Sequence, residues 1–187
     1  GLDGVIDSLS SQLRHLSDLE VGAILPRDVT SLSLLFPVLT QIPAVSNQRK
    51  RAATGLDPQE MRQRGVAALR ELFARLGDRH PLIVIIDDFQ WADPDSARLL
   101  NELMSEPDGP MLMLIVAFRP ETDTRAALLT LRSSLATSRR DIETIELGPL
   151  RDEDVQSLMN QLLNGANEKL LAQALTSANG NPFHIGE

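Results

Sequence analysis

The chain lacks cysteine and tyrosine and has one tryptophan, so aromatic residues make up only 3% of its 187 residues. The absence of cysteine excludes disulfide bonds, thiol catalysis and cysteine metal sites, and the core has to be largely aliphatic. No apolar run approaches the length of a membrane span, and no stretch resembles a signal peptide. We therefore expect a cytoplasmic protein without a membrane partner.

Basic residues are also few, because 18 Lys and Arg face 26 Asp and Glu, which gives a net charge of -8. Such a balance argues against direct binding to nucleic acid, which needs a basic surface. One basic cluster, Gln48-Arg49-Lys50-Arg51, lies in the polar segment 46–58. It fits either a phosphate contact or a solvated loop, and we favour the loop.

Hydrophobic periodicity and turn residues predict alternating strands and helices. This alternation favours parallel β-α-β units and an α/β fold, with a change to all-helical sequence after Gly148. The strand at 82–86 is continuously apolar, which predicts burial on both faces. The expected strands are 82–86, 111–118 and 142–147, and the expected helices are 2–17, 29–35, 58–76, 122–136, 152–163, 168–178 and those starting at 94 and 182.

Two adjacent carboxylates, Asp87 and Asp88, follow the first apolar strand directly. The carboxyl ends of parallel strands are where open α/β sheets bind ligands, and buried acids are costly unless they hold a cation. The pair therefore fits a magnesium–nucleotide site, or alternatively a strand that ends in a solvated acidic turn. In the same loop we expect Trp91 to be a packing residue and Asp93 to cap the next helix.

Two further features have the same ambiguity. Arg119 ends the second apolar run, where it could contact a phosphate or merely pair with Glu121 or Asp123. Gly180-Asn181-Pro182 could contact a ligand or only end one helix and begin another.

Taken together, these motifs resemble the STAND class of AAA+-like P-loop ATPases, found in bacterial kinase-linked and maltose-regulator-type signalling proteins. Ile83 to Asp88, continued by Gln90-Trp91-Ala92-Asp93, is similar to that family's Walker B strand. Leu112 to Arg119 is similar to the next strand, and Gly180-Asn181-Pro182-Phe183 to its helical lid. The resemblance implies a three-layer αβα parallel sheet in which the central P-loop strand is missing, followed by part of an all-helical lid. Its parts would be an N-terminal helical part at 1–80, the Walker B and sensor strands at 81–148 and the start of the lid at 149–187.

The resemblance also implies roles for individual residues. Asp87 would orient Mg²⁺, Asp88 would position the water that attacks ATP, and Arg119 would sense the γ-phosphate. Gly180 and Pro182 would contact the adenine. The module would hydrolyse ATP slowly, and its nucleotide state would control its conformation. Its partners would be ATP or ADP, other domains of the same polypeptide and, in the ATP state, further copies of itself.

The sequence contains no Gly-x-x-x-x-Gly-Lys-Ser/Thr loop, and its two lysines, Lys50 and Lys169, lie outside any glycine-rich loop. We therefore expect a fragment that begins after the P-loop and is inactive alone, and in which the strand at 142–147 leaves a gap or pairs abnormally. Two other hypotheses stay open: a non-hydrolysing scaffold that kept the fold, and a DNA-loading AAA+ relative, which the acidic charge disfavours.

Overall fold

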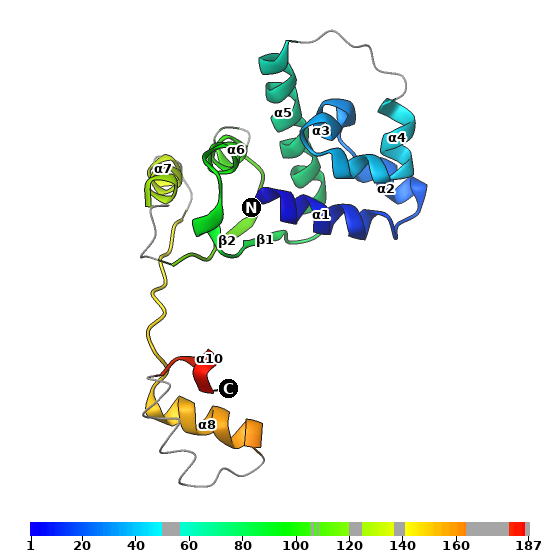
Figure 1. Cartoon of the computed structure of the whole chain (residues 1–187). Coiled ribbons are helices and arrows are strands. Elements are labelled where there is room, and N and C mark those ends of the chain that lie inside the picture. The colour runs from blue at the N-terminus through cyan, green and yellow to red at the C-terminus, as the bar shows by residue number, and fades with distance from the viewer. Residues whose placement is uncertain are drawn as a thin grey trace. The chain divides into compact units, whose positions relative to one another are not determined.

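The computed structural model of the chain divides into two compact units, Gly1–Ile142 and Glu143–Glu187, which are described separately. Figure 1 shows the elements of both. The residues that the structure describes are 1–49, 57–105, 107, 109–119, 125–136, 141–163 and 180–185.

The first unit begins with a group of short helices: α1 (Leu2–Leu13), α2 (Asp18–Ile24), α3 (Val29–Leu35), the 3₁₀ helix η1 (Pro37–Gln41) and α4 (Pro43–Arg49). The predicted helix at 2–17 is therefore too long, and α2 was missed. The reason is a capping box at Ser17, whose hydroxyl accepts a bond from the Glu20 N–H while the Glu20 carboxylate accepts one from the Ser17 N–H. This arrangement starts a new helix at Asp18.

The long helix α5 (Pro58–Gly77) follows, with Asp57 as its cap and proline at its first position, as predicted. Its apolar face packs on α3, and Gly65 lies at the closest point, where a Cβ would come within 3.1 Å of the Ser31 carbonyl oxygen. Arg75 of α5 also donates to the carbonyl of Leu25, at the end of α2, and to Glu71 one turn earlier in α5. The helical group and α5 therefore share one core.

A parallel β-α-β unit completes the described part of this fold, as the alternation predicted. It consists of β1 (Ile83–Ile86), the 3₁₀ helix η2 (Phe89–Trp91), α6 (Pro94–Met104) and β2 (Met113–Val116), followed by α7 (Arg125–Ala136). Ile83 pairs with Met113 and Ile86 with Val116, so both strands end at the same edge of the sheet. The described residues thus form a mixed helix and strand fold around a two-stranded parallel sheet.

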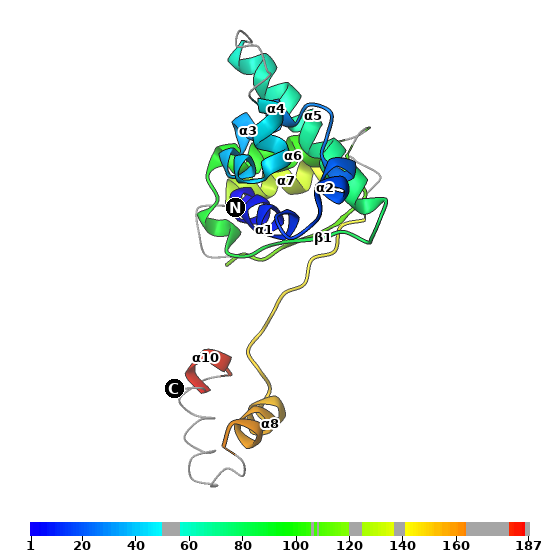
Figure 2. The ribbon, with the colours of Figure 1, turned by 90° about the vertical axis from the view of Figure 1, so that its right-hand side faces the viewer.

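One face of this sheet is covered and the other is open within the described residues, so the prediction of burial on both faces is wrong here. Val84 and Ile86 are buried, whereas Ile83 and Ile85 remain 56% and 63% exposed. Both views show α1 and α6 on the same side of the strands (Figures 1 and 2). This gives one helical layer over the sheet, and the second layer of a three-layer fold stays a prediction.

The core of the first unit is almost wholly aliphatic, as the composition required. Each large side chain that is fully buried contributes about 1.5–3 kcal/mol to folding through loss of apolar surface from water. The largest of them are Phe73, Phe89, Ile6, Leu13, Leu32, Leu39, Ile42, Leu69, Leu72, Leu100, Leu103 and Val29.

The predicted strand at 142–147 is wrong, because residues 141–151 have no regular secondary structure. A strand needs hydrogen-bond partners from a neighbour, and none of the described strands lies beside this segment. Its apolar side chains are exposed as a result, with Ile145 at 73% and Leu147 at 93%.

The second unit contains α8 (Asp152–Leu163) and the single turn α10 (Pro182–Ile185), which begin where the sequence predicted. The predicted helix at 168–178 and residues 122–124 of the predicted helix at 122–136 lie outside the described residues, as do Pro120, Glu121 and Asp123. Among the described helices, none is long and apolar enough to cross a lipid bilayer.

Candidate nucleotide site

The two carboxylates, Asp87 and Asp88, lie at the carboxyl end of β1, and both are exposed. The backbone N–H of Asp88 donates to Oδ1 of Asp87 at 2.8 Å, which orients the Asp87 carboxylate at the end of the strand. Among the described residues, no other hydrogen bond to this carboxylate is found. Its second oxygen, Oδ2, can therefore bind a cation.

Asp88 has a left-handed backbone conformation, with φ 51° and ψ 40°. For residues other than glycine this region costs roughly 1–2 kcal/mol, although aspartate tolerates it better than most. The loop compensates with several backbone bonds, because Trp91 donates to the Asp88 carbonyl at 3.0 Å and Phe89 donates to the Ala117 carbonyl at 2.9 Å. The unusual conformation turns the chain sharply away from the strand while keeping Asp88 at the sheet edge.

Phe89, rather than Trp91, anchors this loop. Phe89 is 2% exposed and belongs to the core, whereas Trp91 is 78% exposed, so the expectation that Trp91 packs is wrong. Both side chains are large and apolar, and sequence alone gave no reason to choose between them. The buried anchor follows the acids directly and limits the movement of Asp88.

Arg119 lies at the carboxyl end of the second strand, three residues after β2, as predicted. Its backbone N–H donates to Oε1 of Gln90 at 3.2 Å, and Nε2 of Gln90 donates to Oδ1 of Asp88 at 2.6 Å. The structure therefore brings Asp87, Asp88 and Arg119 to one edge. Sequence reasoning named Gln90 as part of a motif but gave it no role, and the structure shows that it joins Asp88 to Arg119.

Asp93 caps α6, as expected. Its carboxylate accepts bonds from the backbone N–H of Ser96 at 2.8 Å and from the Ser96 hydroxyl at 2.7 Å. Both bonds hold the pKa of Asp93 below its usual value of 3.8, and the bond from the Ser96 hydroxyl has the larger effect. The cap fixes the start of α6, and so the far end of the loop that carries the acids.

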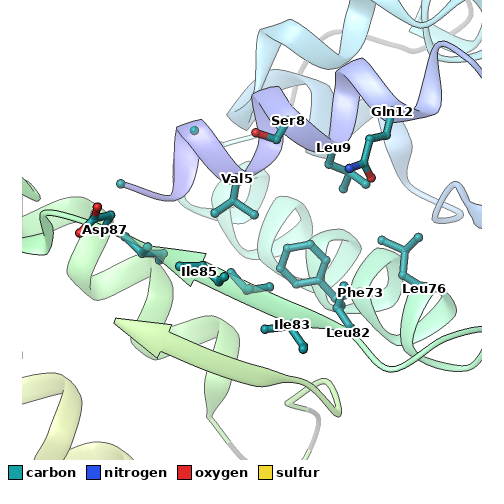
Figure 3. A pocket seen from close by; sticks show the side chains of 14 residues that line it. Val5, Ser8, Leu9, Gln12, Phe73, Leu76, Leu82, Ile83, Ile85 and Asp87 are labelled. Carbon is teal, nitrogen blue, oxygen red and sulfur yellow. The ribbon is translucent and has the colours of Figure 1, made fainter. Parts of the chain in front are cut away.

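A groove with a volume of about 490 Å³ runs along the edge of β1 that does not pair with β2 (Figure 3). One wall is α1, with Val5 and Leu9, and Asp87 lies at one end of the groove. The lining is mainly aliphatic apart from Ser8, Gln12 and Asp87. Its walls suit apolar groups, and Asp87, at the edge of the sheet, is the charged residue in its lining.

Gly180 and Pro182 belong to the second unit. Gly180 has a φ of 74°, and its carbonyl accepts a bond from the Leu150 N–H at 2.8 Å. Asn181 accepts from the Phe183 N–H at 3.0 Å, and Pro182 is the first residue of α10. The expected start of a helix at Pro182 is confirmed, whereas the helix expected to end before Gly180 lies outside the described residues, and a contact with adenine stays a prediction.

The donor set fits magnesium better than a metal held entirely by protein. Within the described part of the chain, no group of three or more His, Asp or Glu side chains could hold a metal ion. Magnesium is commonly held by one or two carboxylates, several waters and the phosphates of a substrate. The oriented carboxylate of Asp87 can supply that protein ligand.

Comparison with known families decides the class of the protein. The AAA ATPase domain family matches residues 5–116, which is more than half of the chain. The chain belongs to the AAA ATPase domain family. It is thus an AAA-type nucleotide-binding ATPase module, and the family generally binds ATP with Mg²⁺. No curated protein and no solved structure matched the chain significantly.

The extent of the family match bears on the individual motifs. It runs from α1 to the end of β2, so it includes Asp87 and Asp88 together with the N-terminal helices. Arg119, Gly180 and Pro182 lie beyond its last residue. The roles expected of these three residues therefore stay predictions.

Proposed function

We propose that this AAA ATPase module binds and hydrolyses ATP as the switch of a larger cytoplasmic signalling protein of the STAND class, linked to a serine/threonine kinase or a transcription regulator. The observation that carries the proposal is the shared edge of the sheet, where Asp87 and Asp88 end β1 and Arg119 follows β2. Two acids and a guanidinium at the carboxyl ends of neighbouring parallel strands suit a nucleotide phosphate with its cation.

Each residue has a distinct role in this proposal. Asp87 holds Mg²⁺, which when bound would neutralise charge on the phosphates. Asp88 orients and deprotonates the attacking water, a role that suits its fixed carboxylate. Arg119 contacts the γ-phosphate, since a guanidinium can bind two phosphate oxygens at once.

The second unit would act as the lid. Its turn at Gly180 and Pro182 would lie against the adenine, and the nucleotide would favour one arrangement of lid and core over another. The lid would transmit this preference to other domains of the polypeptide. Self-association in the ATP state would follow from the same change.

The open face of the sheet supports a larger fold than the described residues make. Ile83, Ile85 and Met113 are all more than half exposed, and Ile115 is 38% exposed, so four large aliphatic side chains form one surface. Exposed patches of this kind mark faces that another element covers. We propose that a second helical layer and a strand with a phosphate-binding loop complete a P-loop sheet here, and that residues outside these 187 supply the loop.

The test is steady-state ATP turnover by the full-length protein and by its Asp88→Asn variant. Loss of a general base slows turnover by about 10²- to 10⁴-fold, so Asp88→Asn should be at least about 100-fold slower. Asp95→Asn is the matched control, because Asp95 is 73% exposed on α6 and pairs with Arg98. Its turnover should equal that of the wild type.

Equal turnover by Asp88→Asn and wild type would remove the role assigned to Asp88. Absence of ATP binding by the wild-type protein would instead favour the alternative function, a non-hydrolysing scaffold with the same fold. That alternative draws support from the sequence itself, which contains no phosphate-binding lysine loop.

A further inference from the structure

The side chain of Gln90 lies between the two halves of the sheet edge. It is 7% exposed, and its amide contacts both Asp88, after β1, and the backbone of Arg119, beyond β2. Through these two contacts Gln90 joins Asp88 to Arg119, which lies 31 residues further along the chain. One buried amide therefore links the catalytic acid of the proposed site to the strand that carries the proposed phosphate sensor.

The chemistry of the two partners suits an amide at this position. An ionised carboxylate can only accept hydrogen bonds, and a backbone N–H can only donate them. A side chain that joins them must donate to one and accept from the other. The orientation of the Gln90 amide, with Nε2 on Asp88 and Oε1 on Arg119, is the one arrangement that satisfies both partners.

The same bond restricts the carboxylate of Asp88. Its backbone is already fixed in the left-handed region, and the short contact of 2.6 Å from Gln90 then sets the direction of its carboxylate. The carboxylate of Asp88 is thus held in one direction, and that direction depends on the position of the end of β2.

We propose that Gln90 is the positioning residue of the ATPase site, which aims Asp88 and couples it to the Arg119 end of β2. This inference rests on the proposed function, because it concerns the orientation of Asp88, the acid that acts on the attacking water in that function. Movement of Arg119 when a γ-phosphate binds would pass through the Gln90 amide to the carboxylate of Asp88. Hydrolysis would then depend on the sensor as well as on the acid.

Two variants separate the two contacts. Gln90→Met keeps a side chain of similar length but removes both the donor and the acceptor. Gln90→Glu keeps the acceptor for the Arg119 N–H but replaces the donor to Asp88 with a second acid. In the full-length protein, both should lower kcat by about 10- to 100-fold, as loss of an orienting partner typically does, with KM for ATP changed less than about twofold.

Hydrogen exchange of the Arg119 amide gives a readout that does not depend on activity. Exchange should be faster in Gln90→Met, which lacks the acceptor, and unchanged in Gln90→Glu, which keeps it. Equal exchange in all three proteins would show that the amide does not hold this strand end, and would overturn the coupling.

A double-mutant cycle with Asp88→Asn distinguishes positioning from general destabilisation. If Gln90 acts through Asp88, adding Gln90→Met to Asp88→Asn should cause no further loss of kcat. Ser33→Ala is the control, because Ser33 is fully buried in the same unit and its hydroxyl donates to the Thr30 carbonyl, away from the sheet edge. It should leave kcat unchanged in either background.

The pattern of results separates the two levels of the proposal. A full additional loss in the double variant would mean that Gln90 acts only on the fold, and would overturn the inference while leaving the proposed function intact. Wild-type kcat in Asp88→Asn alone would overturn the proposed function, and the inference with it. Should Gln90→Met fail to fold, Gln90→Glu tests the same coupling.

Discussion

The contact between α3 and α5 allows a quantitative test of the fold at Gly65. A Cβ added at this position would lie 2.4 Å from Cδ1 of Leu35, 2.7 Å from its Cγ and 3.1 Å from the Ser31 carbonyl oxygen. Carbon atoms in contact normally lie about 3.5–4.0 Å apart. Leu35 is partly buried and packs against the core, so moving it disturbs that packing. The two helices must therefore separate in Gly65→Ala, or Leu35 must repack.

Two opposing effects set the magnitude. Overpacking a core contact costs about 1–3 kcal/mol, and the two Leu35 atoms at 2.4 and 2.7 Å put Gly65→Ala in the upper part of that range, about 2–3 kcal/mol. Alanine is the better helix former and recovers about 1 kcal/mol in the interior of α5. We therefore expect a net loss of about 1–2 kcal/mol, which corresponds to a roughly 5- to 30-fold larger open population.

Native-state hydrogen exchange of the α3 and α5 amides measures this change residue by residue. Exchange should accelerate by the same factor, about 5- to 30-fold. Gly22→Ala in α2 is the control, because no atom lies within 4 Å of the Cβ it would add. That variant should be as stable as wild type or up to about 1 kcal/mol more stable. Exchange in Gly65→Ala that is no faster than in wild type would refute the close approach of the two helices.

Two other perturbations test the ends of the candidate site. Asp93→Asn keeps the cap of α6 but cannot titrate. Because the pKa of Asp93 is lowered, its stabilising effect is complete above its usual value of 3.8 and is lost as pH falls through the lower folded value. The difference in unfolding temperature between wild type and Asp93→Asn should thus be constant from about pH 7 to 5. Below about pH 4 the wild type should lose stability relative to Asp93→Asn. A difference in unfolding temperature that does not depend on pH would contradict this expectation. In the second unit, Gly180→Ala would bring a Cβ within 2.6 Å of the Leu150 carbonyl oxygen at a positive φ, so the Leu150 amide should exchange faster, by about tenfold for a loss of 1–2 kcal/mol. Gly148→Ala, which meets no atom within 4 Å, should leave that exchange unchanged, and an equal effect of both variants would argue against the Gly180 turn.

Local signals in the sequence predicted the elements that local chemistry determines. Asp28 and Asp57 each cap the helix that follows them, and α3 and α5 begin where those caps predict. The capping box from Ser17 to Glu20 carried the same kind of signal for α2, and a search for that pattern would have found it. The parallel pairing of the two apolar runs followed from the helix between them.

Features that depend on distant partners could not be predicted in this way. Residues 142–147 have the alternation of a strand, but a strand forms only where a neighbour offers hydrogen bonds. Size and hydrophobicity did not show that Phe89 is buried and Trp91 exposed, because the left-handed turn at Asp88 decides which side chain points inward. The bridge made by Gln90 needs β1 and β2 in one particular register, and the sequence pattern predicts their parallel pairing but not that register.

The most direct test of the proposed site measures ATP binding and ATP hydrolysis separately in the full-length protein and in Asp88→Asn. Asp88→Asn should bind ATP with Mg²⁺ about as tightly as wild type but hydrolyse it at least about 100-fold more slowly, because Asp88 acts on the water rather than on the nucleotide. Hydrolysis at the wild-type rate by Asp88→Asn would show that Asp88 does not have this role.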